Sequence, residues 1–450
     1  MSQELSKKFG LFTAIAMVVG IVIGSGVFFK AEKILTATGG NLPLGILSWV
    51  IGGLVMISCA CTFAVMATKY ERVNGIVDYA EAAMGRTYGY YVGWFMAMIY
   101  YPTLTSVLAW VSARYTCVLF GWDITGGQCM TIAGFFLVAS YALNALSPVL
   151  AGKFQVTATV IKLIPLALMA VVGTVYGMGN GMIMRNFTSV VTEVEPTVAL
   201  FTAVVATAFA YEGWIIATSI NAELKDSKRN LPIALVAGTF GVMPVYSLYY
   251  VGLAGAVTNE TLMAGGQEGA KLAFETVFSG LGGTLIFVFV IISCLGTLNG
   301  LMLGCTRGIY SIAARGEGPA VRMFSQIDPV SNMPTNSAIF GLLLSAVWLV
   351  YFYGANLTEP WFGFFCFDSS ELPIVSLYAM YLPIFVSFMR NEGDLPVLTR
   401  FVLPALALCG SLFMIYAACY AHGMAVVAYL AIFAVVMLAG AFFANGAVHR

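Results

Sequence analysis

The chain has 450 residues, of which 60% are hydrophobic and only 9% are charged, whereas soluble domains carry about 25% charged residues. This composition and a mean hydropathy of +0.90 exclude a soluble globular protein and indicate a polytopic membrane protein. The 21 basic residues balance the 21 acidic ones, which excludes a nucleic-acid partner because nucleic-acid-binding proteins need a basic surface.

Charge-poor stretches recur along the whole chain, and a helix needs about 20 apolar residues to cross a bilayer. In chain order we predict spans at residues 9–29, 42–68, 87–120, 127–146, 154–176, 196–221, 231–257, 276–314, 335–353 and 364–389, followed by two spans within 401–445. The sequence therefore predicts an all-α membrane protein with twelve transmembrane helices in a single transmembrane domain spanning residues 1–450.

The orientation follows from the placement of lysine and arginine, which favour the cytoplasmic side. With the N-terminus inside, fifteen of these residues fall on the inner side and only four on the outer side, namely Lys30, Lys33, Arg185 and Lys271. We therefore expect a multi-pass protein of the plasma membrane with both termini in the cytoplasm.

Other chemistries find little support in the residues. The nine cysteines form no Cys-x-x-Cys motif, and the only histidines are His422 and His449, so we expect neither a metal site nor another cofactor. The absence of a His-Glu-x-x-His motif argues against an intramembrane enzyme, and the absence of a Thr-Val-Gly-Tyr-Gly filter argues against a channel.

Two of the predicted spans are interrupted. The first breaks at Gly24-Ser25-Gly26 and the sixth breaks between Phe209 and Gly213. Interruptions five spans apart are typical of an inverted repeat, because an odd number of spans turns the second copy over. We predict repeats over residues 9–176 and 196–389, with 401–445 outside them.

A broken helix can recognise an amino acid through its main chain. The amides of Ser25, Gly26 and Val27 open the second half-helix, where free N–H groups and a positive dipole end favour a carboxylate. Carbonyls near Ile21 and Phe209 suit the ammonium group. A side chain at position 26 would block substrate approach. The alternative is that Gly20 and Gly24 form only a helix-packing face.

Five segments carry recognisable motifs, namely GIVIGSGVF at 20–28, GKFQ at 152–155, FAYEGW at 209–214, AELKDSKRNLP at 222–232 and SCLGTLNG at 293–300. These motifs resemble those of the amino acid–polyamine–organocation (APC) superfamily, in particular its L-type amino acid transporter branch. The resemblance implies a LeuT-type fold with broken helices 1 and 6 and transport by alternating access.

The same resemblance implies the substrate site. It places the substrate carboxylate on Gly24, Ser25 and Gly26, and the ammonium on carbonyls at Ile21, Phe209 and the position of Glu212, with Ala210 in the same segment. It also makes Phe209 a gate. This chain departs from the eukaryotic L-type pattern, which has two glycines after the tyrosine where this sequence has Glu212 and Gly213.

Lys162 lies eight residues into the fifth span, where a charge is costly. Either it extends to the inner surface, or its ammonium is held by carbonyls of the first break and by the hydroxyl of Thr297. The second arrangement resembles that of APC superfamily members without sodium coupling, in which a lysine of the fifth helix occupies the position where relatives bind sodium. Lys162 and Thr297 are therefore the predicted coupling residues.

The function predicted is secondary active transport of amino acids, independent of sodium, by proton symport or exchange. A transporter-like amino acid sensor is the alternative, since it would use the same site. We expect an amino acid and the lipid bilayer as partners, and protons as well if transport is symport. Cys129 lies where L-type relatives bond a heavy chain, but the loop-poor chain looks bacterial and no heavy chain is expected. The transported amino acid and the roles of Glu212, Asp368 and Glu371 stay open.

Overall fold

The computed structural model describes residues 10–70, 75–216, 218, 224–329, 332–356 and 359–445, and these are almost entirely helical. Eleven helices in the described part are long and apolar enough to cross a membrane. The first span is shared by two 12-residue helices, α1 and α2, each of which would rise only about 18 Å. Counting this broken span, the prediction of twelve spans is confirmed.

The helices group into two compact units. The first unit comprises residues 1–89, 166–264 and 374–421, and the second comprises 90–165, 265–373 and 422–450. Corresponding spans of the predicted repeats, such as the first and sixth or the third and eighth, therefore fall in the same unit.

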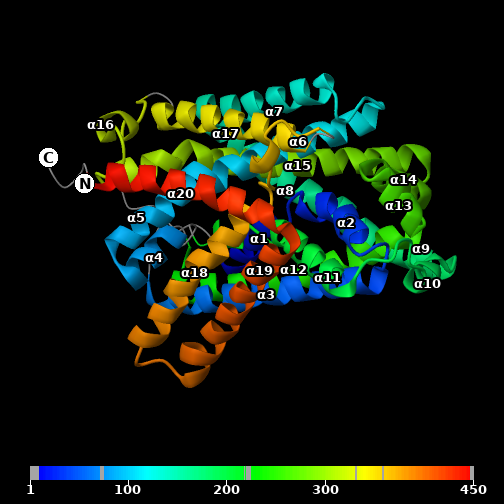
Figure 1. Ribbon diagram of the computed structural model, residues 1–450, viewed down its shortest axis with the longest axis horizontal. Coiled ribbons are helices and arrows are strands. Elements are labelled where there is room, and N and C mark those ends of the chain that lie inside the picture. Colours follow the sequence, from blue (N-terminus) through cyan, green and yellow to red (C-terminus); the bar gives the residue numbers. More distant parts are fainter. Residues whose placement is uncertain are drawn as a thin grey trace. The chain divides into compact units, whose positions relative to one another are not determined.

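The helices of the first unit include both broken spans (Figure 1). Its elements are α1 (Leu11–Val22), α2 (Gly26–Ala37), α3 (Leu42–Lys69), α4 (Ile76–Met84), η2 (Met169–Gly173), α9 (Thr174–Gly179), α10 (Met182–Thr188), α11 (Pro196–Ala210), α12 (Ser227–Ala256), α13 (Asn259–Gly265), α18 (Leu372–Asn391), η5 (Leu398–Val402) and α19 (Leu403–His422). Within it, α12 packs against α1 and α3, and α11 packs against α2 and α3.

The second unit is built around the 34-residue helix α15. Its elements are α5 (Arg86–Phe95), η1 (Met96–Tyr100), α6 (Tyr101–Phe120), α7 (Gly127–Leu146), α8 (Pro148–Leu168), α14 (Gln267–Phe278), α15 (Gly280–Ala313), α16 (Val321–Phe324), α17 (Thr335–Ala355), η4 (Gly363–Phe365) and α20 (Met424–Asn445). Helix α15 packs against α6, α7 and α17.

Helix starts are set by local chemistry. The Asn41 side chain accepts from the Leu44 amide at 3.0 Å and so begins α3, and Glu195 accepts from the Val198 amide at 2.7 Å and so begins α11, each with proline in the first turn. These N-caps satisfy amides that a helix leaves unpaired.

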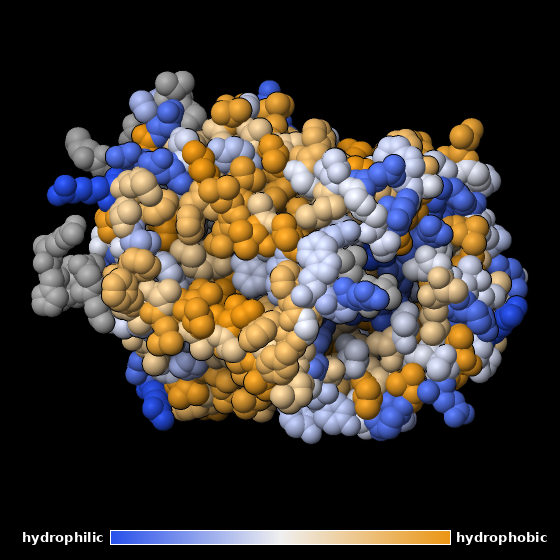
Figure 2. All heavy atoms as spheres, turned by 45° about the horizontal axis from the view of Figure 1, so that its top comes forward, coloured by the Kyte–Doolittle hydropathy of each residue, from blue (hydrophilic) through white to orange (hydrophobic). Residues whose placement is uncertain are grey.

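The molecular surface agrees with a membrane setting. Hydrophobic side chains cover much of the face drawn in Figure 2, and hydrophilic ones gather toward its left and right margins. Exposed apolar side chains include Val160, Leu343 and Phe442, at 62%, 60% and 76% exposure. Such exposure suits a lipid solvent and would be costly in water.

Candidate functional site

The first break opens the chain between α1 and α2. The last bond of α1 runs from the Ile23 amide to the Val19 carbonyl at 2.8 Å, and the first bond of α2 runs from the Phe29 amide to the Ser25 carbonyl at 3.0 Å. The amides of residues 26–28 therefore have no carbonyl partner within the helix, and they lie at the positive end of α2. Ile21 lies in the last turn of α1, where carbonyls lose their helical partners.

The second break follows α11 at Tyr211, and Gly213 takes a φ of +101°. That conformation favours glycine, which explains the glycine at this position of the motif. Trp214 and Ile215 continue into a short turn closed by the Ile216 amide on the Gly213 carbonyl at 2.9 Å. Part of the FAYEGW-to-AELKDSKRNLP segment, residues 217 and 219–223, lies outside the described residues.

The two breaks touch each other through main chain. A Cβ atom at Gly26 would lie 2.5 Å from the Ala210 Cα and 3.0 Å from the Phe209 carbonyl oxygen. Only glycine allows this approach. The amides that open α2 thus lie beside the main chain of Phe209 and Ala210, and a side chain at position 26 would first meet the Ala210 backbone.

Ser25 contributes a polar group with no partner. The residue is 1% exposed, and its hydroxyl makes no hydrogen bond to any described residue. Buried hydroxyls are normally satisfied, so the Ser25 hydroxyl at the start of α2 has hydrogen-bonding capacity left for a water or a ligand. Gly24 and Gly26 flank it and are also buried.

An aromatic cluster of Trp49, Tyr211 and Tyr246, from three different helical segments, supports both breaks. The Tyr246 hydroxyl donates to the Val22 carbonyl at 2.9 Å, and the Tyr211 hydroxyl donates to the Trp49 carbonyl at 2.8 Å. The Tyr211 and Tyr246 rings stack with centroids 5.2 Å apart. Sequence reasoning missed this cluster, because its members are scattered among aromatics that resemble ordinary packing.

Phe209, the predicted gate, is held by neighbours on α2. Its ring lies edge-on to Phe29 with centroids 5.8 Å apart. The Lys30 ammonium lies 5.1 Å from the Phe29 ring and 5.3 Å from the Phe209 ring. Lys30 is 0% exposed, so the residue counted above as an outer-side cation is an interior one that contacts the gate.

Glu212 points into the first unit and away from solvent. It is 8% exposed and lies close enough to Tyr378 and Cys59 to interact electrostatically with both. The Cys59 thiol in turn lies 3.7 Å from the Ser411 hydroxyl. The charge of Glu212 therefore acts on groups of α3 and α18.

The predicted coupling residues belong to the second unit. Lys162 is 2% exposed, so its ammonium does not reach the inner surface. The Thr297 hydroxyl donates to the Ser293 carbonyl of its own helix at 3.0 Å. Within this unit, Ala158 of α8 abuts Gly296 of α15, where an added Cβ would lie 2.5 Å from the Ala158 Cβ.

The contact between Ala158 and Gly296 aligns α8 with α15 and places the Ser293 hydroxyl, which was not predicted, in the same interface. Lys162 lies four residues beyond Ala158 along α8, and Ser293 lies three residues before Gly296 along the antiparallel α15, so both residues stand one turn further along the same interface. The Ser293 hydroxyl is fully buried and unsatisfied in the described part of the chain. Ser293 is therefore a second hydroxyl on the α15 face that packs against α8, beside the predicted Thr297.

Asp368 and Glu371 are not simply hydrated. Glu371 is 1% exposed and pairs with His422, whose Nε2 lies 3.0 Å from a Glu371 oxygen. Asp368 accepts from the Ser370 amide at 2.8 Å. The sequence alone does not predict this pair, because the two residues lie 51 positions apart.

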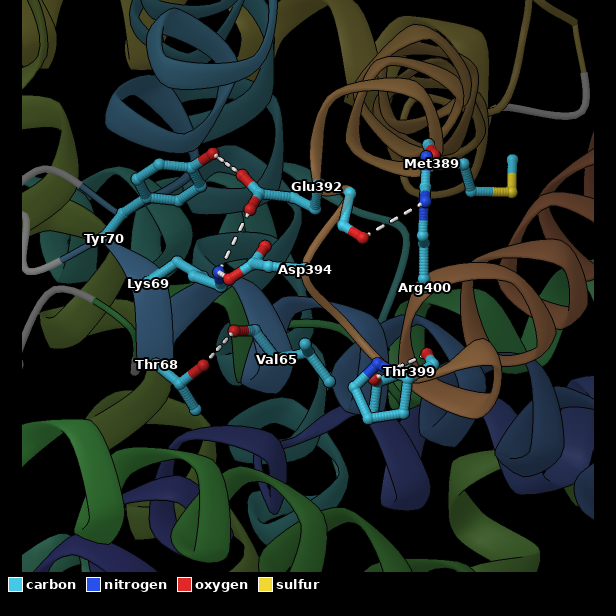
Figure 3. Close-up of polar contacts among 11 residues, drawn as sticks. Val65, Thr68, Lys69, Tyr70, Met389, Glu392, Asp394, Thr399 and Arg400 are labelled. Atoms are coloured by element: carbon cyan, nitrogen blue, oxygen red, sulfur yellow. Dashed lines mark hydrogen bonds and ion pairs between the residues drawn. The ribbon is translucent and has the colours of Figure 1, made fainter.

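A polar cluster closes the end of α3 in the first unit (Figure 3). The Lys69 ammonium lies 2.5 Å from Asp394 and 3.3 Å from Glu392, and the Tyr70 hydroxyl donates to Glu392. The Arg400 Nε donates to the Met389 carbonyl at 2.9 Å. These bonds tie α3 to the connection between α18 and α19.

Two discontinuous membrane helices whose broken ends meet define a class of protein, the membrane transporters that bind solute at unwound helix segments. The particular family follows from the sequence: the chain belongs to the amino acid permease family, whose profile it matches over residues 9–442. It is thus a multi-pass amino acid transporter of the APC superfamily and not an enzyme.

Named relatives and a solved structure agree. The chain is 27% identical over 420 residues to the serine/threonine exchanger SteT of Bacillus subtilis, covering 91% of each chain. It is 26% identical to the human b(0,+)-type amino acid transporter 1, covering 92% of this chain and 83% of that one. It is also 26% identical to the Bacillus subtilis aspartate-proton symporter, covering 78% and 69% respectively.

The structure of MhsT in complex with L-phenylalanine resembles this one with a TM-score of 0.61 at 13% identity, covering 93% of this chain and 100% of that chain. This likeness confirms the LeuT-type fold predicted from the motifs.

Proposed function

We propose that this protein is a secondary active amino acid transporter of the plasma membrane that works by alternating access, without sodium, through proton symport or exchange. The observation that carries the proposal is the close contact between the two breaks, where the backbone of Gly26 packs against Phe209 and Ala210. The Ser25 hydroxyl, which has no partner among the described residues, lies next to Gly26 in the chain. A zwitterion needs donors and acceptors at one place, and this contact supplies both.

In this proposal the carboxylate binds Gly24, Ser25 and Gly26, and the ammonium binds carbonyls at Ile21, Phe209 and Glu212, with Ala210 lining the same opening. The Glu212 carboxyl is suited either to recognise a polar substrate side chain or to carry a proton. Phe209 closes over bound substrate. No heavy chain is required for this chemistry.

The coupling proposal rests on Lys162. A buried ammonium supplies a fixed positive charge where a sodium ion would otherwise need carbonyls and hydroxyls. Its burial at 2% exposure supports this role, and the hydroxyls of Thr297 and Ser293 on α15 are its proposed partners. If the lysine releases a proton during the cycle, transport is symport; if it stays charged, exchange is the expected mode.

The test is uptake of labelled amino acids into proteoliposomes, with sodium and proton gradients imposed separately. Counterflow of any amino acid without sodium supports the proposal, and acceleration by an inward proton gradient selects symport over exchange. Strict dependence on a sodium gradient would contradict it. Substrate binding without counterflow would indicate the sensor instead.

A panel of serine, threonine, neutral and acidic amino acids identifies the substrate. Ser25→Ala is the matched variant, because it removes only the orphan hydroxyl. We expect weaker binding by about tenfold, since a hydrogen bond to a charged group contributes about 1.5 kcal/mol. Unchanged affinity would remove Ser25 from the site.

A further inference from the structure

A shallow groove runs along the membrane-facing surface of the first unit. Its volume is about 680 Å³, and its walls come from α3, α12 and α19, including Val65, Ile233, Ala237, Phe240 and Leu403. All its lining residues fall within helices that are long and apolar enough to cross a membrane. Apolar walls of this kind suit a lipid tail better than water.

The groove has a basic end. On α12, Arg229 lies four residues before Ile233 and eight before Ala237, so it stands on the groove face one turn outside the apolar wall. On α3, Lys69 follows the groove residue Thr68, and on α19 the groove residue Leu403 is preceded by Arg400. Each of the three walls thus has a cation at the same end.

The acidic residues at this end do not neutralise Arg229. Glu392 and Asp394 contact Lys69 at 3.3 and 2.5 Å (Figure 3), and Arg400 lies 4.7 Å over the Phe401 ring. Arg229 is exposed, and in the part of the chain that the structure describes no carboxylate pairs with its guanidinium. Its neighbours Lys225, Asp226 and Lys228 leave this segment positive.

We propose that the groove binds an anionic phospholipid, with one acyl chain along α12 and the phosphate at Arg229. Apolar walls fit the chain, and basic residues just outside a membrane span attract anionic headgroups. The site has a route to function, because Tyr246 lies six residues beyond Phe240 on α12 and holds the first break through Val22. A lipid packed against α12 would steady that helix.

Native mass spectrometry of the detergent-purified protein tests the site directly. The probes are phosphatidylglycerol and phosphatidylcholine with identical acyl chains. We expect wild type to retain phosphatidylglycerol preferentially, and Arg229→Gln to lower that preference about fivefold, the effect of one basic residue near an anionic surface. Ala237→Trp fills the groove and should reduce retention of both lipids.

Two matched variants separate this site from general effects. Lys153→Gln removes an exposed cation from α8, and Val347→Trp adds a bulky ring at a position on α17 that is 65% exposed. Both should behave as wild type. Equal loss of preference in Lys153→Gln, or equal retention in Ala237→Trp and Val347→Trp, would overturn the proposal. Arg229→Gln changes a surface side chain and decides the matter if Ala237→Trp does not fold.

Discussion

At the scale of single residues, Gly26 has the strictest environment at the site. We predict that Gly26→Ala lowers stability and abolishes substrate binding, because its methyl group would lie 2.5 Å from the Ala210 Cα and would push the two breaks apart. Overpacking of this kind costs about 1–3 kcal/mol. Thermal unfolding and ligand-induced thermal shift measure the two effects.

Gly134 provides the matched control for this substitution. It also lies in a membrane helix, but an added Cβ would meet nothing within 4 Å. Gly134→Ala should therefore be neutral or stabilising, by up to about 1 kcal/mol. Equal behaviour of the two variants would show that the contact at Gly26 is unimportant.

Lys30 gives a second prediction at this scale. Its ammonium lies over the Phe209 ring at 5.3 Å, so we expect the two side chains to be coupled in gating by about 1–2 kcal/mol. The measurement is a double-mutant cycle of Lys30→Met and Phe209→Leu, read in counterflow rate and in substrate affinity. Non-additive effects on rate with small effects on affinity support a held gate, and simple additivity in both would contradict it.

The residue scale also marks where sequence reasoning stops. The glycines of the first break were predictable because few other reasons place Gly24 and Gly26 inside an apolar span. Lys30 and Tyr246 were not predictable, because their roles depend on contacts with Phe209 and Val22, far away in the chain. The sequence shows that a charged or aromatic residue is present, but it does not show which residues its side chain contacts.

At the scale of elements, the cluster at the end of α3 makes a pH-dependent prediction. The Lys69 ammonium lowers the pKa of Asp394 below its ordinary value, so the native contact stabilises the ionised carboxylate. That contribution is complete above the unfolded pKa of about 3.9 and is lost as pH falls through the lowered native pKa. We expect Asp394→Asn to be less stable than wild type at pH 7 and equal to it in acid.

Chemical unfolding in one detergent at both pH values provides the measurement. Asp123 is a suitable control position, because its pKa is lowered by hydrogen bonds from Thr125 and not by a cation. High salt should therefore reduce the effect of Asp394→Asn and leave that of Asp123→Asn nearly unchanged. A salt-independent difference at position 394 would rule out the ion pair as its origin.

The elements themselves were largely predictable. Hydrophobic length located the twelve spans, because a bilayer demands about 20 apolar residues wherever the chain crosses. What escaped prediction were contacts at the helix ends, such as Glu371 with His422 at 3.0 Å. Such pairs join the start of one span to the end of another, and neither hydropathy nor motif spacing predicts which helix ends are in contact.

At the scale of the whole molecule, the proposed binding and coupling residues fall in different units. The proposed substrate residues belong to the first unit, and Lys162 belongs to the second. We predict that Lys162→Ala keeps substrate binding and loses gradient-driven accumulation. Saturating substrate should still stabilise the variant, by about 2.7 kcal/mol at a hundredfold excess over Kd.

Thermal shift and proteoliposome uptake report these two properties separately. Lys153→Gln, an exposed lysine near the start of the same helix, is the control and should change neither. Loss of ligand stabilisation in Lys162→Ala would place the lysine in the binding site itself. Full accumulation in that variant would remove it from the coupling mechanism.

The division into repeats at 9–176 and 196–389 remains a prediction. Sequence reasoning finds a repeat from the spacing of two breaks, whereas compact units form by packing, and these units draw on both repeats. The spacing of the breaks can therefore predict the order of the repeats along the chain, but not which helices pack together in a compact unit.

The opening between α1 and α2 has a consequence for how this protein can diverge. Apart from the Ser25 hydroxyl, its proposed contacts are peptide N–H and C=O groups, which no side-chain replacement other than proline removes. Side chains around it, such as Glu212, are free to drift and to alter the accepted amino acid while zwitterion binding persists. Relatives only 26–27% identical, named for serine and threonine in one case and aspartate in another, agree with that freedom. Removing one contact takes backbone chemistry: an ester in place of the Val27 amide would erase a single donor and leave every side chain intact.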